Sequence, residues 1–92
     1  MQLEGGVAVT ITVRYFALIR EASGMSSEEV EWNGSSFTVK EFMSFLSERH
    51  GALREYVEGR RVLCSVNREY AAGEEILKDG DEVALFPAVS GG

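Results

Sequence analysis

Residues 7–15 place a large apolar side chain at every second position, and this pattern constrains the fold more than any other stretch. The apolar positions are Val7, Val9, Ile11, Val13 and Tyr15, and the positions between them are Ala8, Thr10, Thr12 and Arg14. A period of two with many β-branched residues is typical of a strand that buries one face. We therefore expect a sheet with one covered face and one open face.

The covering layer is predicted at residues 39–50, where the sequence changes to helical spacing. Thr38 and Glu41 form a capping box, because their side chains can each satisfy a backbone N–H at the helix start. Phe37 and Phe42 have the spacing of a hydrophobic staple. The apolar stripe of this helix consists of Val39, Phe42, Met43 and Leu46, and Phe45 widens it. We expect the stripe to pack on the sheet as core rather than to bind a cofactor.

The remaining elements are short. A helix is predicted over residues 16–22, an edge strand over 25–32, a helical turn over 52–58, and strands over 62–66, 69–71 and 81–86. Arg49 and His50 lie in the last turn of the long helix, where positive charge interacts favourably with the helix dipole, and Gly51 is positioned to end the helix. One long helix across a mixed sheet of five strands is an α+β arrangement, in which that helix can connect two parallel strands.

Composition and motifs exclude several classes of function. A net charge of −6 argues against nucleic acid, and no apolar run approaches the roughly 20 residues of a membrane span. One Cys and one His exclude a disulfide framework and argue against a metal site, and Cys64 is expected to be a small buried side chain. The start of the chain lacks the features of a signal peptide, which favours the cytoplasm.

The last six residues, 87–92, are predicted to be a flexible tail. Pro87 is expected to end the final strand because proline lacks an N–H, and the chain closes on Gly91-Gly92. Glycine has no Cβ, so such an end can enter a narrow channel, and six extended residues reach roughly 20 Å. A frayed terminus is the alternative. Residues 1–6 are predicted to be a disordered extension, which leaves one domain over residues 7–86.

Four stretches of the sequence form a recognisable set: Val13-Arg14-Tyr15-Phe16-Ala17 with Arg20-Glu21, Val66-Asn67, the run LKDGDEVA at residues 77–84, and FPAVSGG at residues 86–92. Together they resemble the MoaD/ThiS family of ubiquitin-like sulfur carriers, and in particular MoaD, the small subunit of molybdopterin synthase. The resemblance runs from about Val9 to Gly92 and therefore covers nearly the whole chain. It implies the β-grasp (ubiquitin-like) fold, with a mixed sheet of about five strands and one main helix on one face.

The resemblance also implies a role in molybdenum cofactor biosynthesis. A MoeB-like activating enzyme would use ATP to adenylate Gly92, and a thiocarboxylate (1-thioglycine) would then form there. The large subunit, resembling MoaE, would bind the carrier in a heterotetramer and pass the sulfur to the dithiolene of molybdopterin. Gly91 would let the tail enter this partner. The implied partner contacts are Phe16, Tyr70, Phe86, Pro87 and Val89, for which core packing is the alternative.

Other functions remain open at this point. A terminal Gly-Gly is shared with ubiquitin-like modifiers, which join their last glycine to lysines of target proteins. Sulfur carriers for other pathways, such as thiamine synthesis, also have it. A binding module with an incidental tail is a further alternative. The sequence has neither a GxxxxGK phosphate loop nor a nucleophile-elbow motif, so the chain alone is expected to be non-catalytic, with no bound cofactor and no metal.

Overall fold

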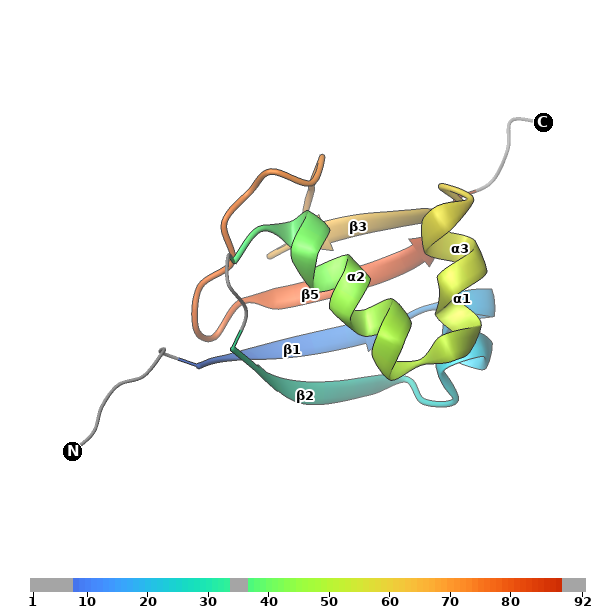
Figure 1. The fold of residues 1–92 in the computed structure, drawn as a ribbon, viewed down its shortest axis with the longest axis horizontal. Coiled ribbons are helices and arrows are strands. Elements are labelled where there is room, and N and C mark those ends of the chain that lie inside the picture. The colour runs from blue at the N-terminus through green and yellow to red at the C-terminus, as the bar shows by residue number, and fades with distance from the viewer. Residues whose placement is uncertain (1–7, 34–36, 89–92) are drawn as a thin grey trace.

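The computed structural model describes residues 8–33 and 37–88 and consists of a five-stranded sheet covered on one face by helices (Figure 1). The strands are β1 (Val9–Tyr15), β2 (Ser27–Trp32), β3 (Val62–Val66), β4 (Glu69–Tyr70) and β5 (Glu82–Pro87). The helices are α1 (Ala17–Ser23), α2 (Val39–Arg49) and α3 (Arg54–Glu58), and a 3-10 turn, η1 (Gly51–Leu53), precedes α3. This architecture confirms the predicted α+β fold and the order of its elements.

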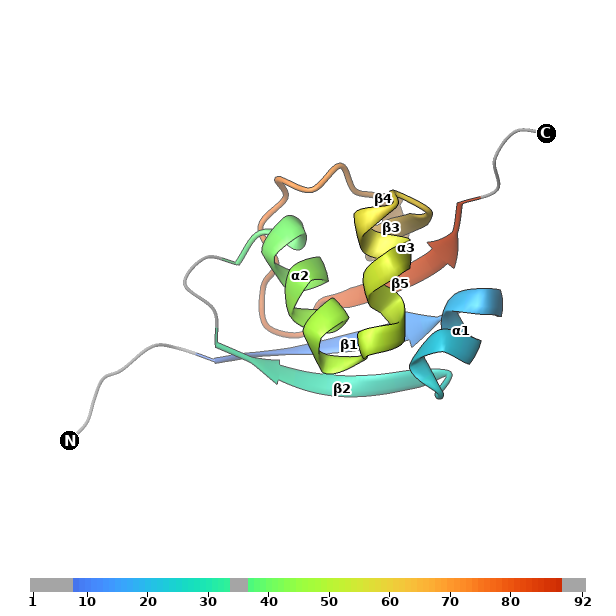
Figure 2. The same ribbon diagram turned by 45° about the vertical axis from the view of Figure 1, so that its right-hand side comes forward.

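The first and last strands lie side by side at the centre of the sheet. The strand order is β2-β1-β5-β3-β4, in which β1 and β5 are parallel and the other neighbouring pairs are antiparallel. Parallel strands cannot be joined by a tight turn, so the chain between them must cross over the sheet. Helix α2 lies across one face of the sheet within this connection, as Figures 1 and 2 show from two directions.

The predicted alternation of β1 is confirmed by its burial. Its helix-facing side chains are all buried, namely Val9, Ile11, Val13 and Tyr15. The apolar stripe of α2 meets them, with Val39, Phe42, Met43 and Leu46 also buried. Trp32 at the end of β2 packs against Phe42 at a ring-centroid distance of 4.9 Å, and Phe37 and Phe45 complete an aromatic cluster around the indole. This cluster fixes the N-terminal half of α2 above the edge strand.

The two ends of α2 differ in how well the sequence predicted them. The Thr38 hydroxyl accepts a hydrogen bond from the backbone N–H of Glu41 at 3.2 Å, as expected of the cap. At the other end the helix stops at Arg49, and His50 adopts an extended conformation. Gly51 then begins η1 instead of ending the helix with a left-handed turn. The end of α2 therefore coincides with contacts of Arg49 and His50, and not with a left-handed glycine.

Those contacts converge on Glu28, a side chain of β2. Arg49 donates to Oε1 of Glu28 from Nε and Nη2, at 3.1 and 2.9 Å. The hydroxyl of Tyr15 donates to Oε2 at 2.6 Å, and Nε2 of His50 lies 2.6 Å from the same oxygen. Burial raises the pKa of Glu28, but hydrogen bonds from Arg49, Tyr15 and His50 outweigh it and lower the pKa from 4.5 to about 2. The network joins the end of α2 to β1 and β2.

Within residues 8–33 and 37–88, the structure contains no helix that has both the length and the apolar character to cross a membrane. The same part of the chain holds no group of three or more His, Cys, Asp and Glu side chains arranged to bind a metal ion.

Replacing Phe42 with Ala is expected to lower the free energy of unfolding by about 3–5 kcal/mol, because it leaves a cavity beneath the Trp32 ring. Chemical denaturation monitored by tryptophan fluorescence measures this change. Glu48→Ala, an exposed substitution on the same helix, is the control and should change stability by less than about 0.5 kcal/mol. A loss below about 1 kcal/mol for Phe42→Ala would contradict the packing described above.

The Glu28 network predicts a specific acid response. Because the pKa of Glu28 is lower in the folded chain, its stabilising contribution is complete above pH 4.5 and is lost as the pH falls toward about 2. Glu28→Gln should therefore be less stable than wild type at pH 7 and should lose less further stability within this window. Denaturation midpoints measured across the window test this. Glu31→Gln, an exposed change on the same strand, should keep the wild-type acid response.

Candidate functional site

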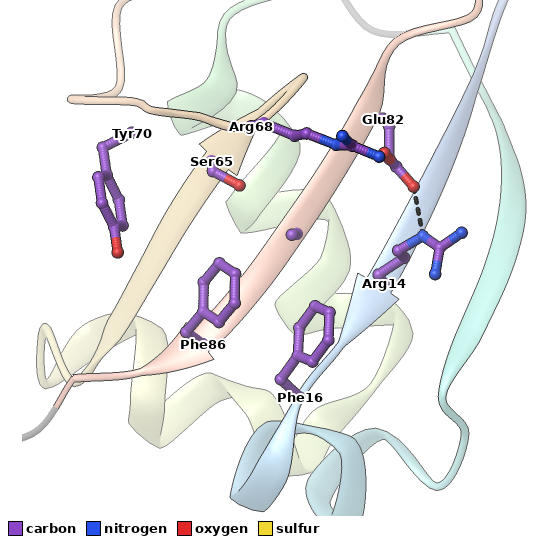
Figure 3. A pocket seen from close by; sticks show the side chains of 8 residues that line it. Arg14, Phe16, Ser65, Arg68, Tyr70, Glu82 and Phe86 are labelled. Atoms are coloured by element: carbon purple, nitrogen blue, oxygen red, sulfur yellow. Dashed lines mark hydrogen bonds and ion pairs between the residues drawn. The ribbon is translucent and has the colours of Figure 1, made fainter.

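The open face of the sheet carries a stacked pair of aromatic rings. Phe16 directly follows β1, and Phe86 lies near the end of β5, so the parallel pairing of the two strands brings them together. The ring centroids are 4.8 Å apart and the planes differ by 9° (Figure 3). The backbone N–H of Phe16 donates to the carbonyl of Leu85 at 3.1 Å, which holds the two residues in register. The pair thus forms one rigid apolar surface.

An open pocket of about 420 Å³ lies beside this pair. It is lined by Arg14, Phe16, Ser65, Arg68, Tyr70, Glu82, Ala84 and Phe86. These side chains come from β1, β3, β4 and β5, from the turn between β3 and β4, and from Phe16 between β1 and α1 (Figure 3). One end of the pocket is aromatic and the other end is charged. The pocket can therefore receive a group that is partly apolar and partly polar.

Three residues expected to contact a partner lie together at this pocket. Phe16 is 37% exposed and Tyr70 is 76% exposed, so core packing, the alternative interpretation, is wrong for both. Phe86 is half-buried by its stacking on Phe16. Large apolar side chains held at a protein surface are frequent anchors of protein–protein interfaces. Partner binding by these three residues stays a prediction.

The charged end of the pocket was only partly visible in the sequence. Arg14 was expected on the open face, and its Nε donates to a carboxylate oxygen of Glu82 on the neighbouring strand. Arg68 extends across the face toward the same carboxylate (Figure 3). The predicted site residues did not include Arg14, Arg68 or Glu82. The signal that could have found Glu82 is its position two residues before Ala84 and four before Phe86, which places all three on one face of the predicted strand.

The prediction that the last strand stops before Pro87 is wrong by one residue. Pro87 is the last residue of β5 and pairs with Val62, and the N–H of Ala88 donates to the carbonyl of Arg61 at 2.9 Å. Neighbouring residues direct their N–H groups to opposite sides of a strand, so the proline nitrogen points away from β3. On that side the pairing of β1 with β5 has already ended at Tyr15, and the missing N–H therefore costs no ladder bond.

The rest of the predicted tail and the N-terminal extension lie outside the described residues. The extension is residues 1–6, and the rest of the tail is residues 89–92, which include Val89, Gly91 and Gly92. Val7, the first residue of the predicted strand, also lies outside the described residues.

Cys64 lies on the helix-facing side of β3 and is buried, as predicted. Burial, with a smaller contribution from the charge of Glu75, raises the pKa of its thiol from 9.0 to about 12. A thiol of this kind is protonated at neutral pH and is a poor nucleophile. Cys64 is therefore a core residue and not a reactive group.

Comparison with known proteins gives a consistent family assignment. A model described as the ThiS family matches residues 13–92. The molybdopterin synthase sulfur carrier subunit of Mycobacterium tuberculosis is 37% identical over 86 residues, which cover 91% of this chain and 99% of that protein. The subunit of the same name from Chlamydomonas reinhardtii is 34% identical over 84 residues, which cover 89% of this chain and 98% of that protein.

A solved structure extends the comparison to three dimensions. The crystal structure of SAMP1, a small archaeal modifier protein from Haloferax volcanii, superposes with a TM-score of 0.76 at 34% identity, covering 90% of this chain and 99% of that one. The structural match confirms the predicted β-grasp fold. The sequence relatives confirm the predicted resemblance, and both are named as sulfur carrier subunits of molybdopterin synthase. Since the family model spans most of the sequence, the chain belongs to the ThiS family.

Proposed function

We propose that this chain carries sulfur as a thiocarboxylate on Gly92 and donates it as the small subunit of a molybdopterin synthase. The observation that supports the proposal most is the position of β5. This strand contributes Phe86 to the exposed aromatic pair and continues to Pro87, and only four residues follow Ala88 in the sequence. A protein that docked on the aromatic pair would therefore meet the segment that leads to Gly91-Gly92.

The proposed chemistry requires activation by another protein. The carboxylate of Gly92 is a poor acyl donor, so it first attacks the α-phosphate of ATP and releases pyrophosphate, which leaves an acyl adenylate. A sulfur nucleophile then attacks the carbonyl carbon, and AMP departs. A MoeB-like enzyme would bind ATP and catalyse these steps, because the sequence lacks a phosphate-binding loop of its own. The need for ATP is consistent with the cytoplasmic compartment that the sequence favours.

The receiving partner is proposed to be a large subunit resembling MoaE. Phe16, Tyr70 and Phe86 would anchor it on the open face, and Pro87 and Val89 would line the entry of the tail. The absence of side chains at Gly91 and Gly92 would let the thiocarboxylate reach a buried pterin precursor. Two carriers and two large subunits would form the heterotetramer expected from the family.

A ubiquitin-like modifier is the second candidate, and the similarity to SAMP1 favours it specifically. In that function the activated carbonyl of Gly92 would be attacked by a lysine amine of a target protein, forming an isopeptide bond. Both functions begin with the same adenylate and differ in the group that displaces AMP. One chain can therefore have both functions.

Incubation with a MoeB-like enzyme, ATP and a sulfide source is expected to replace one oxygen of the intact chain by sulfur. Intact-mass spectrometry detects this exchange, and fragmentation assigns it to Gly92. Deletion of Gly92 should abolish the exchange and leave the melting temperature unchanged, because the described core ends before the tail. Unaltered mass in the wild-type chain would contradict the carrier proposal. Isopeptide-linked adducts in a lysate supplied with ATP would favour the modifier instead.

Phe86→Ala is expected to weaken binding to the large subunit by more than about 1 kcal/mol, because it removes half of the stacked pair. Isothermal titration calorimetry measures the affinity, and circular dichroism verifies that the variant is folded. Ile76→Ala is the matched control, since Ile76 is a large apolar side chain, 58% exposed, that does not line the pocket. Equal affinities for the two variants would exclude Phe86 from the interface.

A further inference from the structure

The charge of the pocket differs from that of the whole chain. The chain has a net charge of −6, yet the charged end of the pocket combines two arginines with one carboxylate. Arg14 is already paired with Glu82. Arg68 takes part in none of the ion pairs formed within residues 8–33 and 37–88. Its guanidinium is therefore available to a partner, next to an exposed apolar surface.

The backbone at Arg68 gives an independent reason to look for a role. Asn67 and Arg68 form the two-residue turn between β3 and β4, and both have a positive φ, of 51° and 73°. Hairpin turns of this kind favour Asn-Gly, because a Cβ is strained at the second position. The chain thus has an arginine at a site where glycine would suit the fold better. Strain of this kind persists where the surrounding structure enforces it, and it is frequent at functional sites.

The surrounding structure does enforce this turn. The side chain of Asn67 donates to Asp81 and accepts from the N–H of Glu82, at 2.9 and 3.0 Å. The backbone N–H of Asn67 donates to the carbonyl of Glu82 at 2.8 Å. Hydrogen bonds of Asn67, and not of Arg68, therefore hold the turn against the start of β5. The arginine side chain is left to extend over the open face (Figure 3).

We propose that Arg68 binds a carboxylate of the partner protein that docks on the Phe16–Phe86 pair, which makes it a specificity-determining residue of the carrier. The inference rests on the function proposed above and adds the chemistry of the partner. The partner would present an apolar side chain to the aromatic end of the pocket and an Asp or Glu to the charged end. The planar guanidinium can hold a carboxylate through two parallel hydrogen bonds.

The Arg14–Glu82 pair gives this recognition its selectivity. Glu82 forms an ion pair with Arg14 and contributes a negative charge beside Arg68. A partner carboxylate that approached Glu82 would be repelled, whereas one that approached Arg68 would be attracted. The negative charge of the whole chain also disfavours polyphosphate or nucleic acid as the occupant. A single acidic side chain of a protein fits these charges best.

The test compares Arg68 variants for binding to the large subunit from the same organism, measured by stopped-flow at low and high salt. Arg68→Glu is expected to lower the association rate by about tenfold at low salt, with a smaller effect at high salt. Arg68→Lys should keep the association rate and dissociate faster, because it retains the charge and loses the planar fork. Arg68→Gly should bind more weakly while its melting temperature stays equal or rises, because glycine relieves the turn.

Arg54→Glu is the control, since it changes the net charge equally at an exposed position of α3, outside the pocket. If the Arg68 variants bound no more weakly than Arg54→Glu, the inference would be overturned. A lower melting temperature with unchanged binding for Arg68→Gly would also overturn it, by showing a structural role. If the wild-type chain neither bound the large subunit nor accepted sulfur, the proposed function itself would fail, and the inference with it.

Discussion

The parallel pairing of β1 with β5 is the constraint on which the remaining structure depends. Neighbouring parallel strands need a crossover, and here the crossover contains the other three strands and all the helices between residues 16 and 81. The same pairing places the residue after β1 beside the end of β5. Phe16 and Phe86 therefore stack although 70 positions separate them in the sequence. The exposed aromatic pair is a direct product of the topology.

The two faces of the sheet have separate roles. The helix-facing side holds the apolar core and the Glu28 network, in which Tyr15, Arg49 and His50 tie the end of α2 to β1 and β2. Because that side supplies the stability, the open side can keep exposed aromatic rings and a strained turn. Substitutions on the open face can then alter recognition without unfolding the chain.

Local patterns predicted the parts of the fold that depend on neighbouring residues. The alternation of β1, the Thr38 cap and the stripe of α2 each occupy one short segment, so spacing alone revealed them. The Glu28 network could not be predicted this way, because its members come from three elements and meet only after the sheet has formed. The charged end of the pocket has the same origin, since Arg14, Arg68 and Glu82 lie on different elements. The sequence excluded Pro87 from the last strand, whereas the structure includes it, because the side to which its missing N–H would point depends on the register of the sheet.

The six residues of strand β5 contribute to the buried core, line the open pocket and lead to the C-terminal segment. Val83 and Leu85 are buried in the core, and Glu82, Ala84 and Phe86 line the open pocket by the alternation of the strand. The burial of the first pair therefore fixes the position of the other three side chains. It also fixes the point from which the segment toward Gly92 departs, since Ala88 is still bonded to Arg61. Under the proposed function, other proteins would supply the chemistry, so the chain would need only to hold this segment in position, and β5 would do so.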